Sequence, residues 1–335
     1  LLGLRAKIVT HGFRKDPFKS QHIISGAHAL RTSSYYFTYD ADFTKVFGLH
    51  DLLIRGNLRA PVNVTNFFGL GNNTIYNQDL RNEQYYRARY NIGNLSVFLR
   101  RHLQSWMRIN YGPTFQYFRV LKDENKNTFV ANEPLQGISR ATLYDRKTYV
   151  GAEAKVDINS RNDPNLATRG VAIDAGVRQL FGLNNSSNNV TQLHVDLGIL
   201  ASFNVDPRVV YGLRFGWARN YGSFEIPQAQ YLSGTENLRG YRRDRFAGRS
   251  VLFFNTEIRL KLAEFSTYLF PGSVGLLFFD DVGRVWTQFD DSHTWHNGFG
   301  GGIWLAPIRR WVVTVSLAHS PEEKILPYVN FGFRF

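Results

Sequence analysis

Long segments of this chain alternate strictly between apolar residues and residues that are polar or small. In residues 209–219, Val209, Tyr211, Leu213, Phe215 and Trp217 fall on one face, and glycines and an arginine lie among the residues between them. The same period of two runs through residues 193–204 and 250–262. Because successive side chains of a strand point to opposite faces, this period predicts β-strands with one apolar face each.

The length of these strands decides between two architectures. Strands of a soluble sandwich usually have about five or six residues, whereas strands that span a membrane need about 9–11. The alternating segments have the greater length, and several end near a tryptophan, as at Trp217, Trp286 and Trp311. Aromatic side chains at strand ends are typical of the two interfacial girdles of a membrane barrel. The pattern therefore predicts an all-β, transmembrane antiparallel β-barrel.

The mean hydropathy of the chain, −0.29, is compatible with this prediction. No segment approaches the roughly 18 consecutive apolar residues that a spanning helix needs. A barrel instead places its apolar residues at every second position, so that it scores as hydrophilic on average.

The alternating segments predict fifteen strands in one barrel domain, residues 1–335. Their approximate bounds are 2–10, 20–30, 33–45, 49–60, 84–101, 104–120, 146–158, 168–180, 191–204, 208–219, 250–262, 273–287, 296–305, 310–319 and 325–335.

The connections between these strands alternate in length. The long and mostly polar ones are 61–83, 121–145, 183–190, 220–249 and 288–295. The others are shorter on average and comprise 46–48, 102–103, 159–167, 205–207, 263–272 and 306–309. Short turns at one end and long loops at the other are the arrangement of outer-membrane barrels, with the short turns in the periplasm.

An odd number of strands places the two ends of the chain on opposite sides of the membrane. Bacterial single-chain barrels have an even number. We therefore expect 16 strands in the intact barrel, with the first strand upstream of Leu1, and an upstream periplasmic or effector domain beyond it. The alternative is that segment 84–101 contains two strands joined by a turn at Gly93–Asn94.

The composition and motifs argue against several other classes of protein. The chain has no cysteine and a formal net charge of +13, from 40 Lys and Arg against 27 Asp and Glu, but the basic residues are scattered and no nucleic-acid partner is expected. Neither H-E-x-x-H nor G-x-S-x-G occurs. We interpret His319 as an interfacial residue, and Asp290, Asp291 and His293 as parts of a solvated loop. No enzyme activity, cofactor or metal is predicted.

Three motifs in the C-terminal third, together with the end of the chain, carry a family resemblance. They read Y-L-S-G-T-E-N-L-R-G-Y at 231–241, L-L-F-F-D-D-V-G-R-V-W at 276–286 and G-F-G-G-G-I-W-L-A-P at 298–307, and the chain ends V-N-F-G-F-R-F. Their order and spacing resemble the bacterial surface antigen family, which is the barrel family of BamA, TamA and the two-partner secretion transporters. K-D-P-F at 15–18 resembles that family's turn between its second and third strands, which also supports a first strand upstream. N-F-F-G-L-G-N at 66–72 resembles its external loops.

The resemblance implies that the long loop 220–249 folds into the barrel lumen. Its tip would be Arg239-Gly240-Tyr241, and the matching wall motifs would be Phe279-x-Asp281-x-Gly283 and Gly300-x-Gly302. Strand parity independently points Glu257 and Asp281 into the lumen, where a guanidinium can meet both carboxylates. Gly240 removes the side chain where the tip turns, and Gly298, Gly300 and Gly302 share a face that leaves room for the loop.

The terminal segment 325–335 predicts a weak closing seam. Parity directs Ile325, Val329, Phe331, Phe333 and Phe335 to lipid and Leu326, Tyr328, Asn330, Gly332 and Arg334 inward. Pro327 has no N–H to donate, and Gly332 weakens the strand further. The alternative is that Pro327 occupies the first rung of the strand, where a missing donor costs little.

The resemblance implies a barrel that inserts or translocates polypeptides at the outer membrane of a Gram-negative bacterium. Its expected partners are outer-membrane lipid, lipopolysaccharide, client polypeptides and accessory periplasmic or lipoprotein subunits. One alternative is a membrane anchor for a fused effector such as a hydrolase. Another is a passive porin, against which the long loop 220–249 argues.

Overall fold

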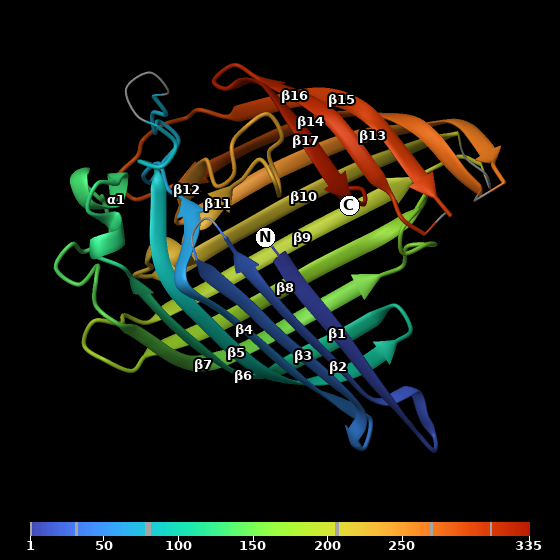
Figure 1. The fold of residues 1–335 in the computed structure, drawn as a ribbon, viewed down its shortest axis with the longest axis horizontal. Coiled ribbons are helices and arrows are strands. Elements are labelled where there is room, and N and C mark those ends of the chain that lie inside the picture. The colour runs from blue at the N-terminus through green and yellow to red at the C-terminus, as the bar shows by residue number, and fades with distance from the viewer. Residues whose placement is uncertain (1, 31–32, 78–81, 205–207, 269–270, 309) are drawn as a thin grey trace.

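The computed structural model describes residues 2–335 except 31–32, 78–81, 205–207, 269–270 and 309. Fifteen strands form one continuous antiparallel sheet in chain order, and a separate pair of short strands lies within the long connection after the tenth. Figure 1 shows the large sheet curving around an interior. No helix among the described residues is long and apolar enough to cross a membrane.

The first ten strands of the sheet follow one another directly. They are β1 (Leu2–Gly12), β2 (Lys15–Ala29), β3 (Ser34–Phe47), β4 (His50–Asn66), β5 (Arg87–Gln104), β6 (Met107–Val120), β7 (Lys147–Asn159), β8 (Gly170–Gly182), β9 (Val190–Ala201) and β10 (Val209–Gly222). The remaining five are β13 (Ser250–Ser266), β14 (Pro271–Trp286), β15 (His296–Pro307), β16 (Val313–Ser320) and β17 (Lys324–Phe331).

The predicted strands are confirmed in number, and their bounds agree with the structure to within six residues, the largest differences being at the start of β2 and the end of β4. The alternative division of segment 84–101 is wrong, because β5 runs through Gly93 and Asn94 and pairs there with Asn57 and Leu58 of β4. The motif at 15–18 lies at the start of β2, directly after the turn from β1, and not in the turn itself.

The alternation of side chains appears in the structure as two distinct faces of the wall. Along β13, Phe254 and Ile258 are exposed on the outer face, whereas Phe253, Glu257 and Arg259 are buried inside. In a strand that lies between two others, the backbone N–H and C=O groups are hydrogen-bonded to the neighbouring strands. The side chains then decide the polarity of the outer face, and an apolar outer face suits contact with lipid.

The last strand is shorter than predicted, and this corrects its expected faces. β17 ends at Phe331, and Gly332 follows with a φ of +98°, a left-handed conformation that favours glycine. The chain then leaves the sheet. Phe335 is only 7% exposed and packs against Ala167, Leu200 and Val210 inside the barrel. The prediction that Phe333 and Phe335 face lipid is therefore wrong, while Ile325, Val329 and Phe331 do lie exposed on the outer face.

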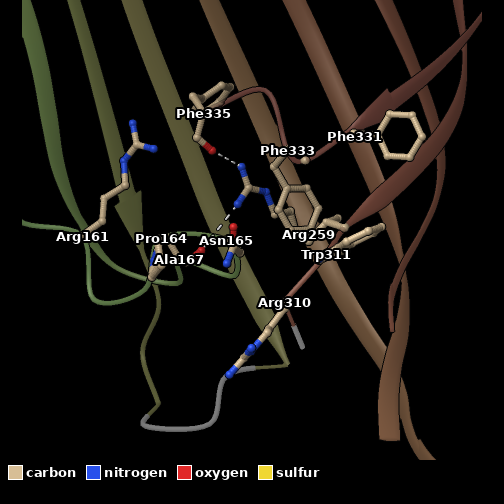
Figure 2. Close-up of a pocket in the computed structure, with 12 residues that line it drawn as sticks. Arg161, Pro164, Asn165, Ala167, Arg259, Arg310, Trp311, Phe331, Phe333 and Phe335 are labelled. Carbon is tan, nitrogen blue, oxygen red and sulfur yellow. Dashed lines mark hydrogen bonds between the residues drawn. The ribbon is translucent and has the colours of Figure 1, made fainter. Parts of the chain in front are cut away.

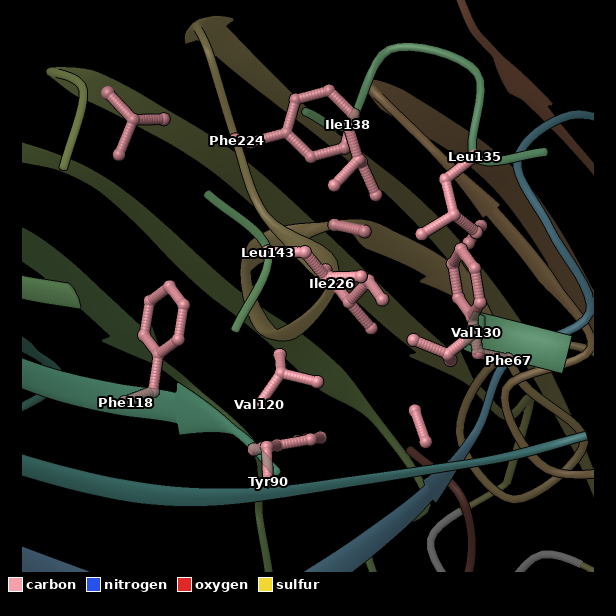
Figure 3. Packing of buried hydrophobic residues seen from close by; sticks show 14 of the residues in the cluster. Phe67, Tyr90, Phe118, Val120, Val130, Leu135, Ile138, Leu143, Phe224 and Ile226 are labelled. Carbon is pink, nitrogen blue, oxygen red and sulfur yellow. The ribbon is translucent and has the colours of Figure 1, made fainter. Parts of the chain in front are cut away.

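An apolar core fills the interior at the end that carries the long loops. It joins inner-face residues of β5 and β6, such as Tyr90 and Phe118, to Val130 of helix α1 (Phe129–Asn132) and to Ile226 of the connection between β10 and β13. Figure 3 shows these side chains converging from the wall and the loops. The 3₁₀ helices η1 (Asp123–Asn125) and η2 (Ile226–Gln228) belong to the same loops. The loops are thus packed structure, built over the inner face of the sheet.

Candidate functional site

The connection between β10 and β13, residues 223–249, folds into the lumen, and we call it the strap. It contains η2 and the short strands β11 (Gln230–Leu232) and β12 (Phe246–Gly248), which pair with each other. Near its start, buried Lys147 of β7 donates a 2.6 Å bond to Glu225. Four strap side chains, those of Leu232, Leu238, Tyr241 and Phe246, pack on Val251, Phe253 and Val285 of the wall.

Arg239, at the tip of the strap, lies between two wall carboxylates. Its Nε and Nη2 donate to the two oxygens of Asp281 at 2.7 and 2.8 Å, which is a bidentate fork. Its Nη1 donates to Glu257 at 2.7 Å, and its backbone N–H donates to Asp281 at 2.8 Å. The guanidinium lies 3.6 Å from the centre of the Phe279 ring, a cation–π contact. The structure therefore brings together the residues that parity placed in the lumen.

The electrostatics of this cluster balance burial against charge pairing. Arg239 is only 3% exposed. Burial by itself lowers the pKa of a guanidinium, but Asp281 and Glu257 more than offset this effect, so the pKa of Arg239 is raised. Glu257 also accepts a 2.7 Å bond from Arg259. One buried carboxylate is thereby shared by two arginines, which leaves the cluster fully paired.

Gly240 and Tyr241 turn the strap tip against β15, β16 and β17. Gly240 has a φ of +94°, and a Cβ there would lie 2.9 Å from the carbonyl oxygen of His319. Its carbonyl accepts a 2.6 Å bond from Ser320, and its N–H donates to the Tyr328 hydroxyl at 3.0 Å. Tyr328 in turn donates to the carbonyl of Tyr241 at 2.7 Å. The tip is thus held by the last two strands as well as by β13 and β14.

The glycines of the wall motifs make room for different neighbours. A Cβ on Gly298 would lie 1.8 Å from the carbonyl oxygen of Arg239, so this glycine admits the strap backbone. A Cβ on Gly283 would lie 2.8 Å from Leu232 of the strap. At Gly300 the obstacles are the carbonyl of Leu317 and the Phe279 ring, and at Gly302 they belong to β16. Of the three glycines predicted to share a face, only Gly298 therefore leaves room for the strap.

A second set of ion pairs ties the strap to the turn between β16 and β17. The backbone N–H of Arg242 donates to Glu323 at 2.9 Å, and the Nε of Arg245 lies 3.0 Å from the other carboxylate oxygen. Burial raises the pKa of Glu323 to about 7, and the two arginines only partly oppose this effect. Glu322 beside it accepts from His296 at 2.7 Å. None of these residues was predicted from the sequence as part of the site.

Three further contacts, two of them with the strap, were not predicted from the sequence. Arg334, after β17, donates to the carbonyl of Gly234 at 2.9 Å. Asn72 exchanges two bonds with the backbone of Val285, at 2.8 and 3.0 Å, and Leu70 forms a bridge to Ala247 of the strap. Parity directed Arg334 inward but did not name its partner, and the signal for residues 70 and 72 was the resemblance of 66–72 to a family loop, because contacts between loops produce no periodicity in the sequence.

The two edges of the large sheet are β1 and β17. Gly332 donates its N–H to the carbonyl of Val312 at 2.7 Å. Hydrogen-bonded and non-hydrogen-bonded pairs alternate along an antiparallel ladder, so the pairs Pro327 with Leu317 and Val329 with Val315 are of the second kind. The backbone of Pro327 and Val329 is therefore directed away from β16, toward the open edge.

This geometry refines the predicted role of Pro327. It is the fourth residue of β17, so the alternative that it occupies the first rung is wrong. Its missing donor lies on the edge and costs no bond to β16, which is where a sheet tolerates proline. Gly332 and Phe335, which were also predicted to belong to the seam, lie beyond the end of β17.

One curved antiparallel sheet of long strands, with an apolar outer face and a strap inside, is the architecture of an outer-membrane β-barrel. The profile of the Omp85 superfamily domain matches residues 23–308, and the chain therefore belongs to this superfamily. The protein is therefore located in the outer membrane of a Gram-negative bacterium.

Solved structures show the same fold at low sequence identity. A BamA from Haemophilus ducreyi lacking POTRA domains 1–3 has a TM-score of 0.68 and 14% identity, over 98% of this chain and 67% of that one. CdiB from Acinetobacter baumannii has a TM-score of 0.55 and 11% identity, over 93% of this chain and 53% of that one. CdiB from Escherichia coli has a TM-score of 0.56 and 12% identity, over 98% of this chain and 62% of that one. The chain thus spans between about half and two thirds of these structures. No curated protein sequence matches it.

Proposed function

We propose that this protein inserts or translocates polypeptides at the outer membrane, and that clients engage the edge of β17, at the seam where the barrel closes. The observation that carries the proposal is that the backbone groups of Pro327 and Val329, at alternate positions of β17, are directed away from β16. Such an edge pairs readily with an added strand. Membership of the Omp85 superfamily and the fold shared with BamA and CdiB support this proposal.

The filled interior argues against a passive porin. A barrel of this size without internal structure leaves an aqueous channel. Here the strap is pinned to the wall by Arg239, and the apolar core covers the same end of the interior. A sixteenth strand before Leu1 stays a prediction, and so do an upstream domain and accessory subunits.

The experiment compares two substitutions at one edge position. Val329→Pro removes an N–H that faces the edge but leaves the bonds between β17 and β16, whereas Val329→Ala changes the same side chain and keeps the N–H. The wild-type protein in liposomes should accelerate the folding of an unfolded outer-membrane barrel. We expect the proline variant to lose most of this acceleration and the alanine variant to retain it.

The folded state of both variants is checked by the melting temperature of the sheet, measured by circular dichroism. Equal acceleration of folding by the two variants would show that clients do not pair with the edge of β17. No acceleration by the wild-type protein would instead favour the anchor for a fused effector domain.

A further inference from the structure

A pocket of about 380 Å³ lies at the end of the barrel that carries the short turns. Its lining comes from four separate segments, as Figure 2 shows: the β7–β8 connection with Arg161, strand β13 with Arg259, the β15–β16 turn with Arg310 and Trp311, and the terminal segment from Phe331 onward. Its volume lies within the range of roughly 300–1,000 Å³ that is usual for small-ligand sites.

Arginine side chains dominate the charge of this pocket. Three arginines and no Asp or Glu side chain occur among the described residues that line it. Arg259 is fixed in place, because its Nε donates to Glu257 at 2.7 Å and its Nη2 donates to the carbonyl of Phe335. Within the part of the chain that the structure describes, Arg161 and Arg310 have no ion-pair partner, so two guanidiniums at this pocket are available to an anion.

Arg161 is partly buried, which favours the binding of an anion beside its guanidinium. Burial lowers its pKa, and Asp196 only partly opposes the effect. A guanidinium nevertheless stays charged at any physiological pH, so an anion that binds beside Arg161 offsets part of the cost of its burial. Planar guanidiniums suit phosphate oxygens in particular, since they donate in a bidentate fork.

The outer rim of the pocket faces lipid. Trp311 is 70% exposed and Phe331 is 83% exposed, and Phe331 belongs to the apolar outer face of β17. Tryptophan at the end of a spanning strand lies at the level of the lipid head groups. The same pocket thus offers cations toward the interior and apolar rings toward the membrane.

We propose that this pocket binds the phosphate group of an anionic phospholipid. Arg161 and Arg310 contact the phosphate oxygens, while the acyl chains lie along Trp311 and Phe331. A basic pocket beside a lipid-facing wall is a recognised mode of head-group binding. The carboxylates of a polypeptide would satisfy the arginines equally well, but they would leave the two exposed rings without a partner, so we favour the lipid. This inference does not depend on the proposed function.

The test measures retention of phosphatidylglycerol by the purified protein in detergent, using native mass spectrometry. The variants are Arg161→Gln, Arg310→Gln and the two combined, and the matched control is Arg169→Gln. Arg169 is an exposed arginine on the same connection as Arg161 and does not line the pocket. We expect each pocket variant to weaken retention by about tenfold, because a hydrogen bond between charged groups is lost, and the control to match the wild type.

Two competitors identify the source of the ligand. Displacement of the lipid by millimolar inorganic phosphate would support the phosphate site and assign it to free phosphate. Displacement by an aspartate-rich peptide but not by phosphate would overturn the proposal in favour of a polypeptide ligand. Equal retention by the double variant and Arg169→Gln would overturn it outright. The melting temperature of the sheet, compared among all variants, shows that each has folded.

Discussion

At the scale of single residues, Arg239 joins the strap to two carboxylates of the wall. Every polar atom that this side chain presents to the wall is directed at a carboxylate, and both carboxylates are buried. Removing one partner of a buried pair leaves an uncompensated charge and typically costs roughly 3–5 kcal/mol. A single substitution at Arg239 is therefore expected to weaken the attachment of the strap.

We expect Arg239→Ala to release the strap while the sheet still forms. Glu257 would keep Arg259, but Asp281 would lose its side-chain donors. Limited trypsin digestion of the folded barrel should then cleave within residues 223–249, which resist cleavage in the wild type. Arg243→Ala is the matched control, because Arg243 lies on the same strap and is exposed. Digestion patterns that do not differ between the two variants would show that Arg239 does not hold the strap.

Glu323 gives the strap contact a predictable pH dependence. Its pKa is raised from 4.5 to about 7, so the folded protein binds this proton more tightly than the unfolded chain between those two values. The contribution of Glu323 to stability is therefore greatest at low pH, and it falls as the pH rises toward 7, by up to about 3 kcal/mol. Arg242, Arg245 and Glu322 are the charged groups beside it.

The measurement is the rate of strap proteolysis between pH 6 and pH 8, with a protease of constant activity over this range. The wild type should be cleaved more slowly at pH 6. Glu323→Gln should lose most of this difference, because its amide stays neutral throughout. An equally steep pH dependence in the variant would assign the effect to another group, such as His296, which contacts Glu322.

At the scale of elements, strands were predictable and the contacts between loops were not. A period of two fixes both the existence of a strand and the face of each residue, which is why Glu257 and Asp281 could be placed inside from parity alone. The motif resemblance then supplied Arg239 as their partner. No comparable rule links Arg245 to Glu323 or Asn72 to Val285, since these residues lie far apart in the sequence.

The terminal segment shows where parity fails. Alternation continues through Phe333 and Phe335, so the sequence pattern extends the strand to the end of the chain. Gly332 ends it instead, because its positive φ turns the chain into the lumen. There Phe333 lies against the guanidinium of Arg259, 3.9 Å from ring centre to carbon. An apolar residue suits lipid and a buried core equally, so hydrophobicity could not distinguish the two.

At the scale of the whole molecule, the barrel has internal structure at both ends. The strap and the apolar core cover the end with the long loops, and the β7–β8 connection with the terminal segment covers part of the other. Among the described residues, the strands of the wall are paired in order from β1 to β17, and these two strands form the edges of the sheet. A polypeptide that uses this protein would therefore meet the edge before it meets an open lumen.

Photo-crosslinking from the edge tests this account most directly. A photoreactive amino acid is placed at Val329 on β17 or at its partner Val315 on β16. Both residues are exposed on the outer face, but β16 is paired on both sides. During synthesis of outer-membrane proteins in cells, the account predicts abundant adducts with client polypeptides from position 329 and few from position 315. Equal capture at both positions, or none at 329, would contradict it.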